Sequence, residues 1–252
     1  MKTIDLNADL GEGISWEGEL LDLVTSANVC CGAHAGSPET TRATVEACLA
    51  RGIRVGAHPG YPDPSHFGRR TLHALDMKSR DVAHHLAKQV GLIPEAAYIK
   101  PHGALYNDSA TSFGGSRNPE AWQALGEDGD SWQDMDDTLV PAAFLLKFVF
   151  VKYQLPLMGL SGTYHEEIAW FSGHPLIREG FIDRRYGENG LLLSRSHPDA
   201  LILNPGEAAD QALRLAETCD SLCIHGDNPE SPRILACVRG ELERAGYSVK
   251  AP

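Results

Sequence analysis

Short apolar segments recur along the chain, and several of them end at a cluster of polar residues. Each segment is too short for a helix and is bounded by Gly or Pro, a pattern that favours buried strands. We expect strands at residues 3–6, 24–29, 54–57, 97–99, 157–160, 177–181 and 222–224.

Helical patterns lie between these segments. Ser37 and Pro38 are typical of a helix start, because Ser caps free backbone N–H groups and Pro fits the first turn. Val82, Leu86 and Val90 are four residues apart, which predicts one helical face. We expect helices from 37 to 52, after Asp81, over 142–153 and 207–217, and from Ser231 onward.

The alternation of strand and helix predicts parallel pairing of the strands. At least six of the expected strands end in polar residues. A doubly wound open sheet places its site near one switch point, whereas a barrel spreads its site over many strand ends. We therefore predict an α/β fold in which residues 1–252 form a single (β/α)-barrel domain, closed or nearly closed, with about seven parallel strands.

Composition and charge narrow the function classes. Hydrophobic residues make up 42% of the 252 residues and charged residues 22%, which is typical of a globular domain. A net charge of −12, with no Lys/Arg run longer than two residues, argues against nucleic-acid binding. No stretch approaches the roughly 20 apolar residues that span a bilayer. The six cysteines form no C-x-x-C pair, so we expect a cytoplasmic protein with free thiols, without nucleic-acid or membrane partners.

Residues 108–140 interrupt the pattern. They hold eight acidic residues and a single base, Arg117, among several glycines. We expect a long, solvated acidic insertion, whose position after a polar strand end would allow it to cover the site.

Two polar motifs near the N-terminus suit acid–base chemistry or metal binding. Asp9 and Glu12 stand three residues apart in a Gly-bearing loop after a strand. They could act as acid and base or hold a metal, and an Asx-type turn at Asp9 is the structural alternative. His34 stands just before a helix start, where the dipole favours a neutral imidazole and a nearby anion, although it could also only cap the loop.

Further polar residues follow the later strands. Lys100 at a buried strand end is costly unless it is paired or functional. Arg69 and Arg70 suit a phosphate or a carboxylate, and a surface pair is equally compatible. Alternation along the sixth strand places Glu179 and Asp183 on one face. The same strand ends carry His58, His102, Asn107, Arg184, His225 and Asp227.

Ordered motifs cover most of the chain. They are NADLGE at 7–12, TSAN at 25–28, CGAHAG at 31–36, GAHPGYPD at 56–63, FGRR at 67–70, KPHGALYN at 100–107, LSG at 160–162, FIDR at 181–184 and HGD at 225–227. Taken together, these motifs resemble the LamB/YcsF family, which is also called the family of 5-oxoprolinase A subunits. So many motifs in one order argue against a chance similarity.

The resemblance implies a distorted (β/α) barrel related to the glycoside hydrolase/deacetylase barrels. It implies cleavage of 5-oxo-L-proline to L-glutamate, an opening of a cyclic amide coupled to ATP hydrolysis, with two partner subunits, B and C. The expected cofactor is ATP with Mg²⁺, and no flavin, haem or nicotinamide is expected. The sequence has no Walker A loop and no G-x-G-x-x-G, so a bound nucleotide would not be held by a P-loop or a Rossmann turn of this chain.

Under this interpretation the candidate site residues share strand-end positions. The predicted catalytic residues are Asp9, Glu12, His34, His58, Lys100, His102, Asp183 and Asp227, and the predicted substrate- or phosphate-binding residues are Asn7, Arg69, Arg70, Asn107, Arg184 and His225. Lys100 and Arg184 would stabilise charge on the carboxylate or phosphoryl group. Asp9 and Glu12 would be general base or magnesium ligands, and the three histidines would position water or polarise the carbonyl.

Two features depart from the family pattern. Ser37 stands where the family usually has Asp, and residues 108–140 look longer and more acidic than the usual connection. Ser and Asp are both good N-caps, so the change is mild at a cap and serious at a ligand position.

Two other functions stay open. A stand-alone metal-dependent deacetylase or hydrolase would use Asp9, His34, His58 and Asp227 as an Asp/His metal site. A non-catalytic subunit would bind a small acid without chemistry. No metal ligand is assigned from the sequence.

Overall fold

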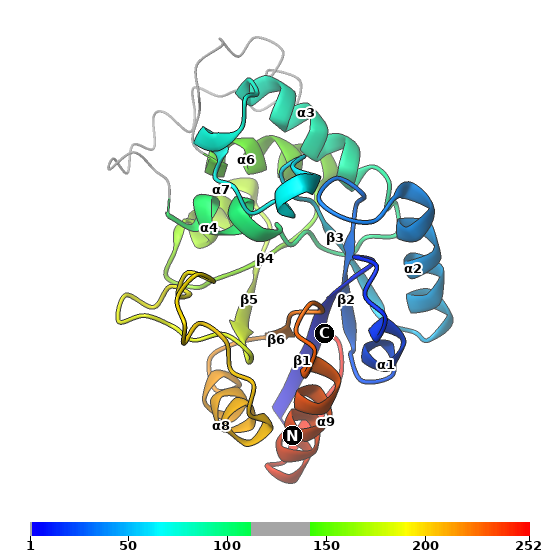
Figure 1. The fold of residues 1–252 in the computed structure, drawn as a ribbon, viewed down its shortest axis with the longest axis vertical. Coiled ribbons are helices and arrows are strands. Elements are labelled where there is room, and N and C mark those ends of the chain that lie inside the picture. Colours follow the sequence, from blue (N-terminus) through cyan, green and yellow to red (C-terminus); the bar gives the residue numbers. More distant parts are fainter. Residues whose placement is uncertain (1, 112–141) are drawn as a thin grey trace.

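The computed structural model describes residues 2–111 and 142–252 (Figure 1). Its sheet is built from parallel strands in the order β3-β2-β1-β6-β5-β4, and β7 pairs with the first residues of β1. The strands are β1 (Lys2–Leu10), β2 (Ser26–Cys30), β3 (Arg54–His58), β4 (Leu157–Gly159), β5 (Leu176–Phe181), β6 (Ser221–Ile224) and β7 (Tyr247–Val249).

The segment around Ile99 joins the two edges of this sheet. Ile99 forms parallel bridges to Ala57 of β3 and to Leu157 of β4. The Ala57 N–H donates to the Tyr98 carbonyl at 2.9 Å, and the Ile99 N–H donates to the Pro156 carbonyl at 2.9 Å. The ring of strands therefore returns on itself, and the predicted distorted (β/α) barrel is confirmed. The short Ile99 segment occupies the position of the fourth predicted strand.

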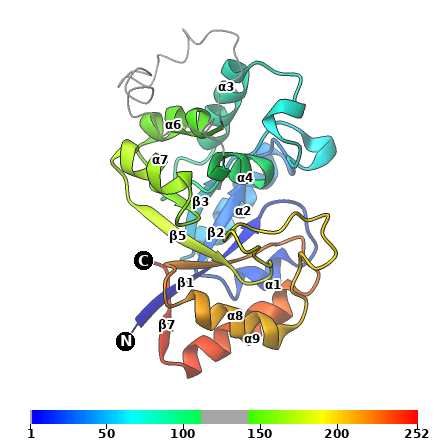
Figure 2. The same cartoon turned by 90° about the vertical axis from the view of Figure 1, so that its left-hand side faces the viewer.

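Helices cover the outside of the strands (Figures 1 and 2). In Figure 1, α2 lies beside β2 and β3, and α8 and α9 lie near β1. The helices are α1 (Glu17–Leu21), α2 (Pro38–Ala50), α3 (Ser79–Val90), α4 (Gly103–Thr111), α6 (Ala142–Tyr153), α7 (Tyr164–Ser172), α8 (Pro205–Leu215) and α9 (Ser231–Arg244), with short 3₁₀ turns η1 (Pro64–His66) and η2 (Leu72–Ala74).

All five predicted helices are present, and the sequence pattern missed α1, α4 and α7. One start also differs, because α8 begins at Pro205, where the Asn204 side chain accepts hydrogen bonds from the Gly206 and Glu207 N–H groups. The first residues of the predicted acidic insertion, 108–111, belong to α4 instead. The rest of that insertion lies outside the described residues.

Strand β1 shows how the barrel places polar side chains inside. Leu6, Ala8 and Leu10 belong to the main hydrophobic cluster, while Asp5, Asn7 and Asp9 alternate with them and are also buried. Each of these three polar side chains has hydrogen-bond partners on neighbouring strands. A buried polar group is tolerated when it is paired. The polar side chains of β1 therefore form a row of hydrogen-bonded groups that runs through the interior toward the carboxyl ends of the strands.

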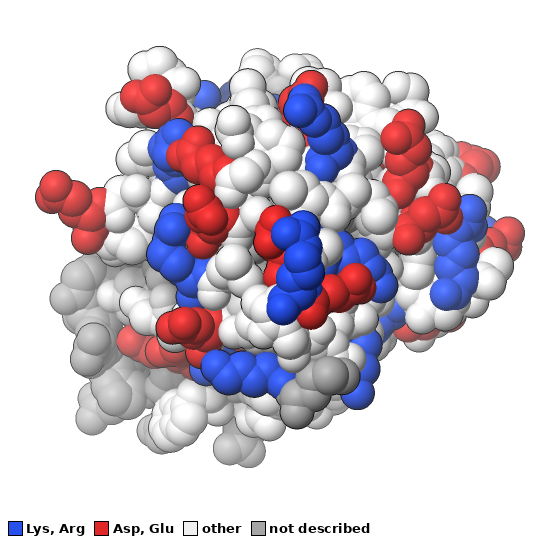
Figure 3. Space-filling model, turned by 90° about the horizontal axis from the view of Figure 1, so that it is seen from below, with Lys and Arg blue, Asp and Glu red and all other residues white. Residues whose placement is uncertain are grey.

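No helix within residues 2–111 and 142–252 is long and apolar enough to cross a membrane. On the face seen in Figure 3, basic and acidic side chains are interspersed.

Candidate active site

A cavity of about 400 Å³ opens at the carboxyl ends of the strands. Its wall combines cationic, imidazole and apolar groups from β1, β3, β5, α4 and the loops that follow the strands. The lining includes Asp9, His58, Arg69, Lys100, His102, Tyr106, Asn107, Leu160, Phe181, Arg184, Arg195 and His225.

Lys100 forms the centre of a buried charge cluster in this wall. Its Nζ donates to Asp9 Oδ1 at 3.0 Å and to Cys223 Sγ at 2.9 Å, and it lies 2.8 Å from Glu179 Oε1. The Lys100 side chain is only 2% exposed. One buried cation is thus shared by two carboxylates from β1 and β5, which offsets much of the desolvation cost of each.

The protonation states in this cluster follow from the pairing. Burial alone would raise the pKa of Asp9, but Lys100 and His58 hold that pKa well below its ordinary range. Burial would lower the pKa of Lys100, but Asp9 holds it well above its ordinary range. Asp9 is therefore ionised and Lys100 is charged, which suits Lys100 as an electrostatic group and not as a base.

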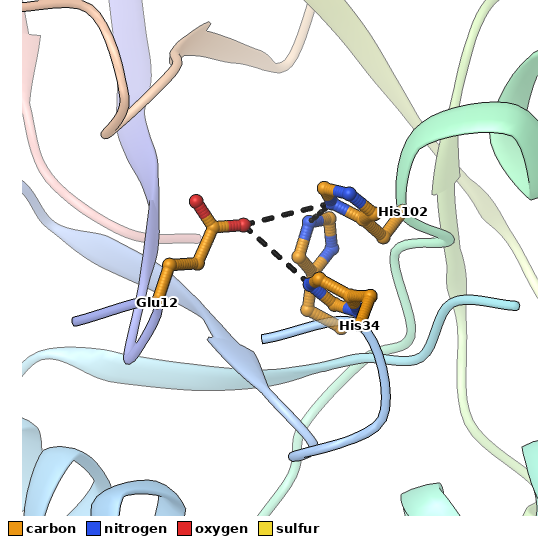
Figure 4. A group of neighbouring side chains, drawn as sticks. Glu12, His34 and His102 are labelled. Carbon is orange, nitrogen blue, oxygen red and sulfur yellow. Dashed lines mark hydrogen bonds and ion pairs between the residues drawn. The ribbon is translucent and has the colours of Figure 1, made fainter. Parts of the chain in front are cut away.

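Three histidines and Glu12 form a second buried cluster beside the first. Glu12 Oε1 lies 3.5 Å from His34 Nε2 and 3.6 Å from His102 Nδ1 (Figure 4). His102 Nδ1 lies 3.0 Å from His58 Nε2. The His34 and His102 rings are stacked with centroids 3.7 Å apart. Among the described residues, these four side chains are the group whose ligand atoms could converge on one metal ion.

The environment of this second cluster disfavours charge on its members. Burial, followed by His58, lowers the pKa of His34 to about 3. Burial, followed by His34, holds the pKa of His102 well below its ordinary range. Burial, followed by the negative charge of Asp9, holds the pKa of Glu12 well above its ordinary range.

Arginines line one side of the cavity, and Asp227 pairs with two of them. Asp227 accepts hydrogen bonds from Arg69 at 2.6 Å and Arg195 at 2.9 Å. Burial, followed by the positive charge of Arg195, lowers the pKa of Arg184 to about 10. This side of the cavity is positively charged and suits an acid.

Asp183 fixes one further imidazole of the cavity. It accepts a hydrogen bond from His225 Nδ1 at 2.9 Å. Burial would raise the pKa of Asp183, but His225 holds it below its ordinary value. The His225 ring also stacks on Phe181, so both its tilt and its hydrogen bond are set by neighbours.

Comparison with known proteins agrees with this architecture. A sequence model described as the LamB/YcsF family matches residues 4–114 and 135–252. The chain belongs to the LamB/YcsF family. Its relatives include two proteins that are named as A subunits of 5-oxoprolinase. The one from Neisseria meningitidis serogroup C (strain 053442) is 36% identical over 272 residues and covers 100% of both chains. The one from Streptomyces avermitilis is 34% identical over 275 residues and covers 98% of this chain and 99% of the relative.

A solved structure supports the family fold. The crystal structure of the lactam utilization protein from Thermus thermophilus matches with a TM-score of 0.78 at 32% identity. The match covers 100% of both chains. This LamB/YcsF family chain therefore shares its barrel with that protein over its full length.

Eight of the fourteen predicted site residues line the cavity, namely Asp9, His58, Arg69, Lys100, His102, Asn107, Arg184 and His225. Four others contact residues of this lining, namely Glu12, His34, Asp183 and Asp227. Asn7 and Arg70 stand apart. Asn7 lies one layer deeper, where its Nδ2 donates to Ser221 Oγ at 2.7 Å and its Oδ1 accepts from Asn28. Arg70 donates two hydrogen bonds to Asp63 and is absent from the cavity lining. Both were predicted to bind substrate or phosphate, which stays a prediction, and the contacts seen here hold neighbouring polar groups in place.

Two of the four predicted alternative metal ligands, His34 and His58, belong to the group that converges, and the two aspartates do not. Asp227 is engaged by Arg69 and Arg195. Asp9 is engaged by Lys100, although its Oδ2 lies 3.5 Å from His58 Nε2. Glu12 and His102 take the places that were predicted for these aspartates.

Three residues that contact the buried charges or the cavity were not assigned to the site from the sequence. Glu179 contacts Lys100, and its position on one face with Asp183 was the available signal. Cys223 also contacts Lys100, but a lone cysteine in a buried strand carries no signal. Arg195 stands in a loop after β5 that has no motif, and only the fold brings it to Asp227.

Proposed function

We propose that the chain is the A subunit of an ATP-dependent 5-oxoprolinase, which converts 5-oxo-L-proline to L-glutamate together with subunits B and C. The observation that carries the proposal is the full-length similarity to relatives named as A subunits of 5-oxoprolinase. The cavity at the carboxyl ends of the strands is where a barrel enzyme places its chemistry.

The cavity has the size and charge for a small cyclic acid. Arg69, Arg184 and Arg195 line it and supply cationic donors for a carboxylate or a phosphoryl group. Tyr106, Leu160 and Phe181 belong to one apolar cluster and line the cavity, and their surface suits the methylene groups of a five-membered ring.

The charged wall supplies the groups that an amide opening needs. A lactam is stabilised by resonance, so ATP would phosphorylate the amide oxygen and water would then open the ring. Lys100 would stabilise the charge that develops on that oxygen, because it stays protonated beside Asp9 and Glu179. His58 and His102, which also line the cavity, would orient the ring carbonyl or the water.

The donor atoms do not fit Mg²⁺ at Glu12. Mg²⁺ prefers oxygen ligands, whereas Glu12 faces two imidazole nitrogens, and Asp9 is held by Lys100. We therefore assign no magnesium to these two carboxylates, and their predicted role as magnesium ligands is not supported by their surroundings.

Replacing Arg184 tests the cavity as the substrate site. In the assembled enzyme, Arg184→Ala should lower kcat/KM for 5-oxoproline by about 100-fold, the usual scale for a lost charge-assisted contact to an anion. Arg233→Ala is the matched control, since the Arg233 side chain is 76% exposed on α9. Equal kcat/KM in both variants and in the wild type would remove Arg184 from the site.

A second candidate function is a stand-alone metal-dependent hydrolase. The observation in its favour is the convergence of Glu12, His34, His58 and His102. Hydrolysis of amide or acetyl substrates by the purified chain with Zn²⁺ and without ATP would support it, and activity that strictly requires ATP and partner subunits would exclude it.

A further inference from the structure

Two imidazole nitrogens in the second cluster face each other at close range. His58 Nδ1 lies 2.8 Å from the Lys100 carbonyl, and His102 Nε2 lies 2.9 Å from the Phe67 carbonyl. A carbonyl only accepts, so each of these nitrogens carries an N–H. A neutral imidazole has one N–H. With both rings neutral, as metal ligands are, His58 Nε2 and His102 Nδ1 would present lone pairs to each other at 3.0 Å.

Glu12 adds a buried oxygen without a hydrogen-bond partner to the same point. Its Oε1 is buried and has no hydrogen-bond partner among the described residues. The Glu12 side chain is only 2% exposed, and the carboxylate points at His34 and His102 (Figure 4). A carboxyl oxygen and two imidazole nitrogens thus converge in a buried space, and a bound cation would displace the Glu12 proton and take all of them as ligands.

We propose that Glu12, His34, His58 and His102 bind one divalent metal ion of the zinc class. Tetrahedral Zn²⁺ with bonds of about 2.0–2.1 Å holds its ligand atoms about 3.3–3.4 Å apart. The observed separations are 3.0 Å, 3.5 Å and 3.6 Å, and all four ligand atoms lie within 4.8 Å of one another. Imidazole nitrogen with one carboxylate oxygen suits Zn²⁺ and its first-row neighbours better than Mg²⁺ or Ca²⁺.

The groups around the cluster are those that orient metal ligands. The Lys100 and Phe67 carbonyls fix the tautomers of His58 and His102, as second partners of ligating histidines commonly do. Phe67 adopts φ 54°, a left-handed conformation that is costly for a bulky residue and aims its carbonyl at His102. Gly60 lets the rings approach, because a Cβ there would lie 2.7 Å from His34 Nδ1.

Zinc titration of the purified full-length chain tests this site without any assay of turnover. After chelator treatment and buffer exchange, the wild type should bind one equivalent of Zn²⁺ by calorimetry and by elemental analysis, and its Tm should rise with Zn²⁺. Glu12→Gln should weaken Zn²⁺ binding by at least about tenfold, because an amide is a poor ligand. Glu46→Gln, at a position 68% exposed on α2, is the matched control and should bind as the wild type does.

Cobalt substitution identifies the ligands in the wild type and needs no variant to fold. Co²⁺ should give the visible bands of a tetrahedral site and no strong near-ultraviolet thiolate band. A thiolate band would show that Cys30, whose Sγ lies 3.3 Å from His34 Nε2, replaces Glu12 and would overturn the proposed ligand set. Less than about one-tenth equivalent of bound Zn²⁺, or equal affinity in Glu12→Gln and wild type, would overturn the site itself. These results are independent of whether the chain opens 5-oxoproline.

Discussion

Lys100 is the residue on which the buried charges of the barrel depend. Asp9 and Glu179 both lie against its ammonium, and both are almost fully buried. The sequence predicted a functional or paired Lys100, because a lone charge at a buried strand end is costly. It did not indicate that a single lysine pairs with carboxylates from two strands, since the fold sets the order β1-β6-β5 that brings these carboxylates together.

Removing this charge should destabilise the protein strongly. Lys100→Met leaves two carboxylates buried without a counter-ion, so we expect the free energy of unfolding to fall by about 3–5 kcal/mol. Urea unfolding followed by circular dichroism measures this. Lys88→Met, on the exposed face of α3, should change it by less than about 0.5 kcal/mol. A loss below about 1 kcal/mol in Lys100→Met would show that the cluster does not carry the expected charges.

The carboxylate of Asp63 should make the stability of the protein depend on pH. Two hydrogen bonds from Arg70 lower the pKa of Asp63 from 3.8 to about 2. A depressed carboxylate pKa contributes stability that is present above the unfolded pKa and is lost as pH falls toward the folded pKa. The free energy of unfolding of the wild type should therefore exceed that of Asp63→Asn by about 1–2 kcal/mol at pH 6, after allowance for the partly exposed Arg70. This difference should shrink as the pH falls from 4 to 2.

The free energies of unfolding of the wild type and of Asp63→Asn, measured between pH 2 and pH 6, test this prediction. Asp76→Asn, on an exposed part of the same loop region, controls for the loss of one negative charge. A wild-type advantage over Asp63→Asn that stays constant down to pH 2 would mean that the carboxylate of Asp63 is not the source.

At the scale of elements, α2 shows a local signal that the structure confirms. Ser37 caps it as predicted, with its Oγ accepting from the Thr40 N–H at 3.2 Å. The missed helices gave weaker signals. Helix α4 begins at Gly103 within a polar motif and has only a low amphipathic pattern, and α1 has five residues. Their helical form depends on tertiary contacts more than on local sequence.

The cap explains why Ser37 can replace the family's usual Asp. Ser37→Ala should lower the free energy of unfolding by about 1 kcal/mol, and Ser37→Asp should keep it within about 0.5 kcal/mol, because Asp and Ser both cap well. Chemical unfolding of the three proteins measures this. Steady-state assays of Ser37→Asp in the assembled enzyme should give an unchanged kcat/KM, and a large change would mean that position 37 acts on the substrate and not only as a cap.

At the scale of the whole molecule, the pattern of strands predicted the barrel well. All seven predicted strand positions are present, because short apolar runs bounded by Gly and Pro are a strong signal. The candidate site was predictable as a set of strand ends, since a barrel gathers them at one face. The division of that set into a lysine cluster, a histidine cluster and an arginine rim was not, because loop conformation decides which of Glu12, His34 and Asp227 meet.

The central claim is that this chain serves as the A subunit of a 5-oxoprolinase. The most direct measurement is glutamate release from 5-oxoproline by the purified chain, with and without ATP–Mg²⁺ and with and without subunits B and C of proven activity. We expect glutamate only in the complete mixture, with ATP hydrolysed in proportion. A folded chain that yields no glutamate with active partners, or that releases it equally without ATP, would contradict this claim.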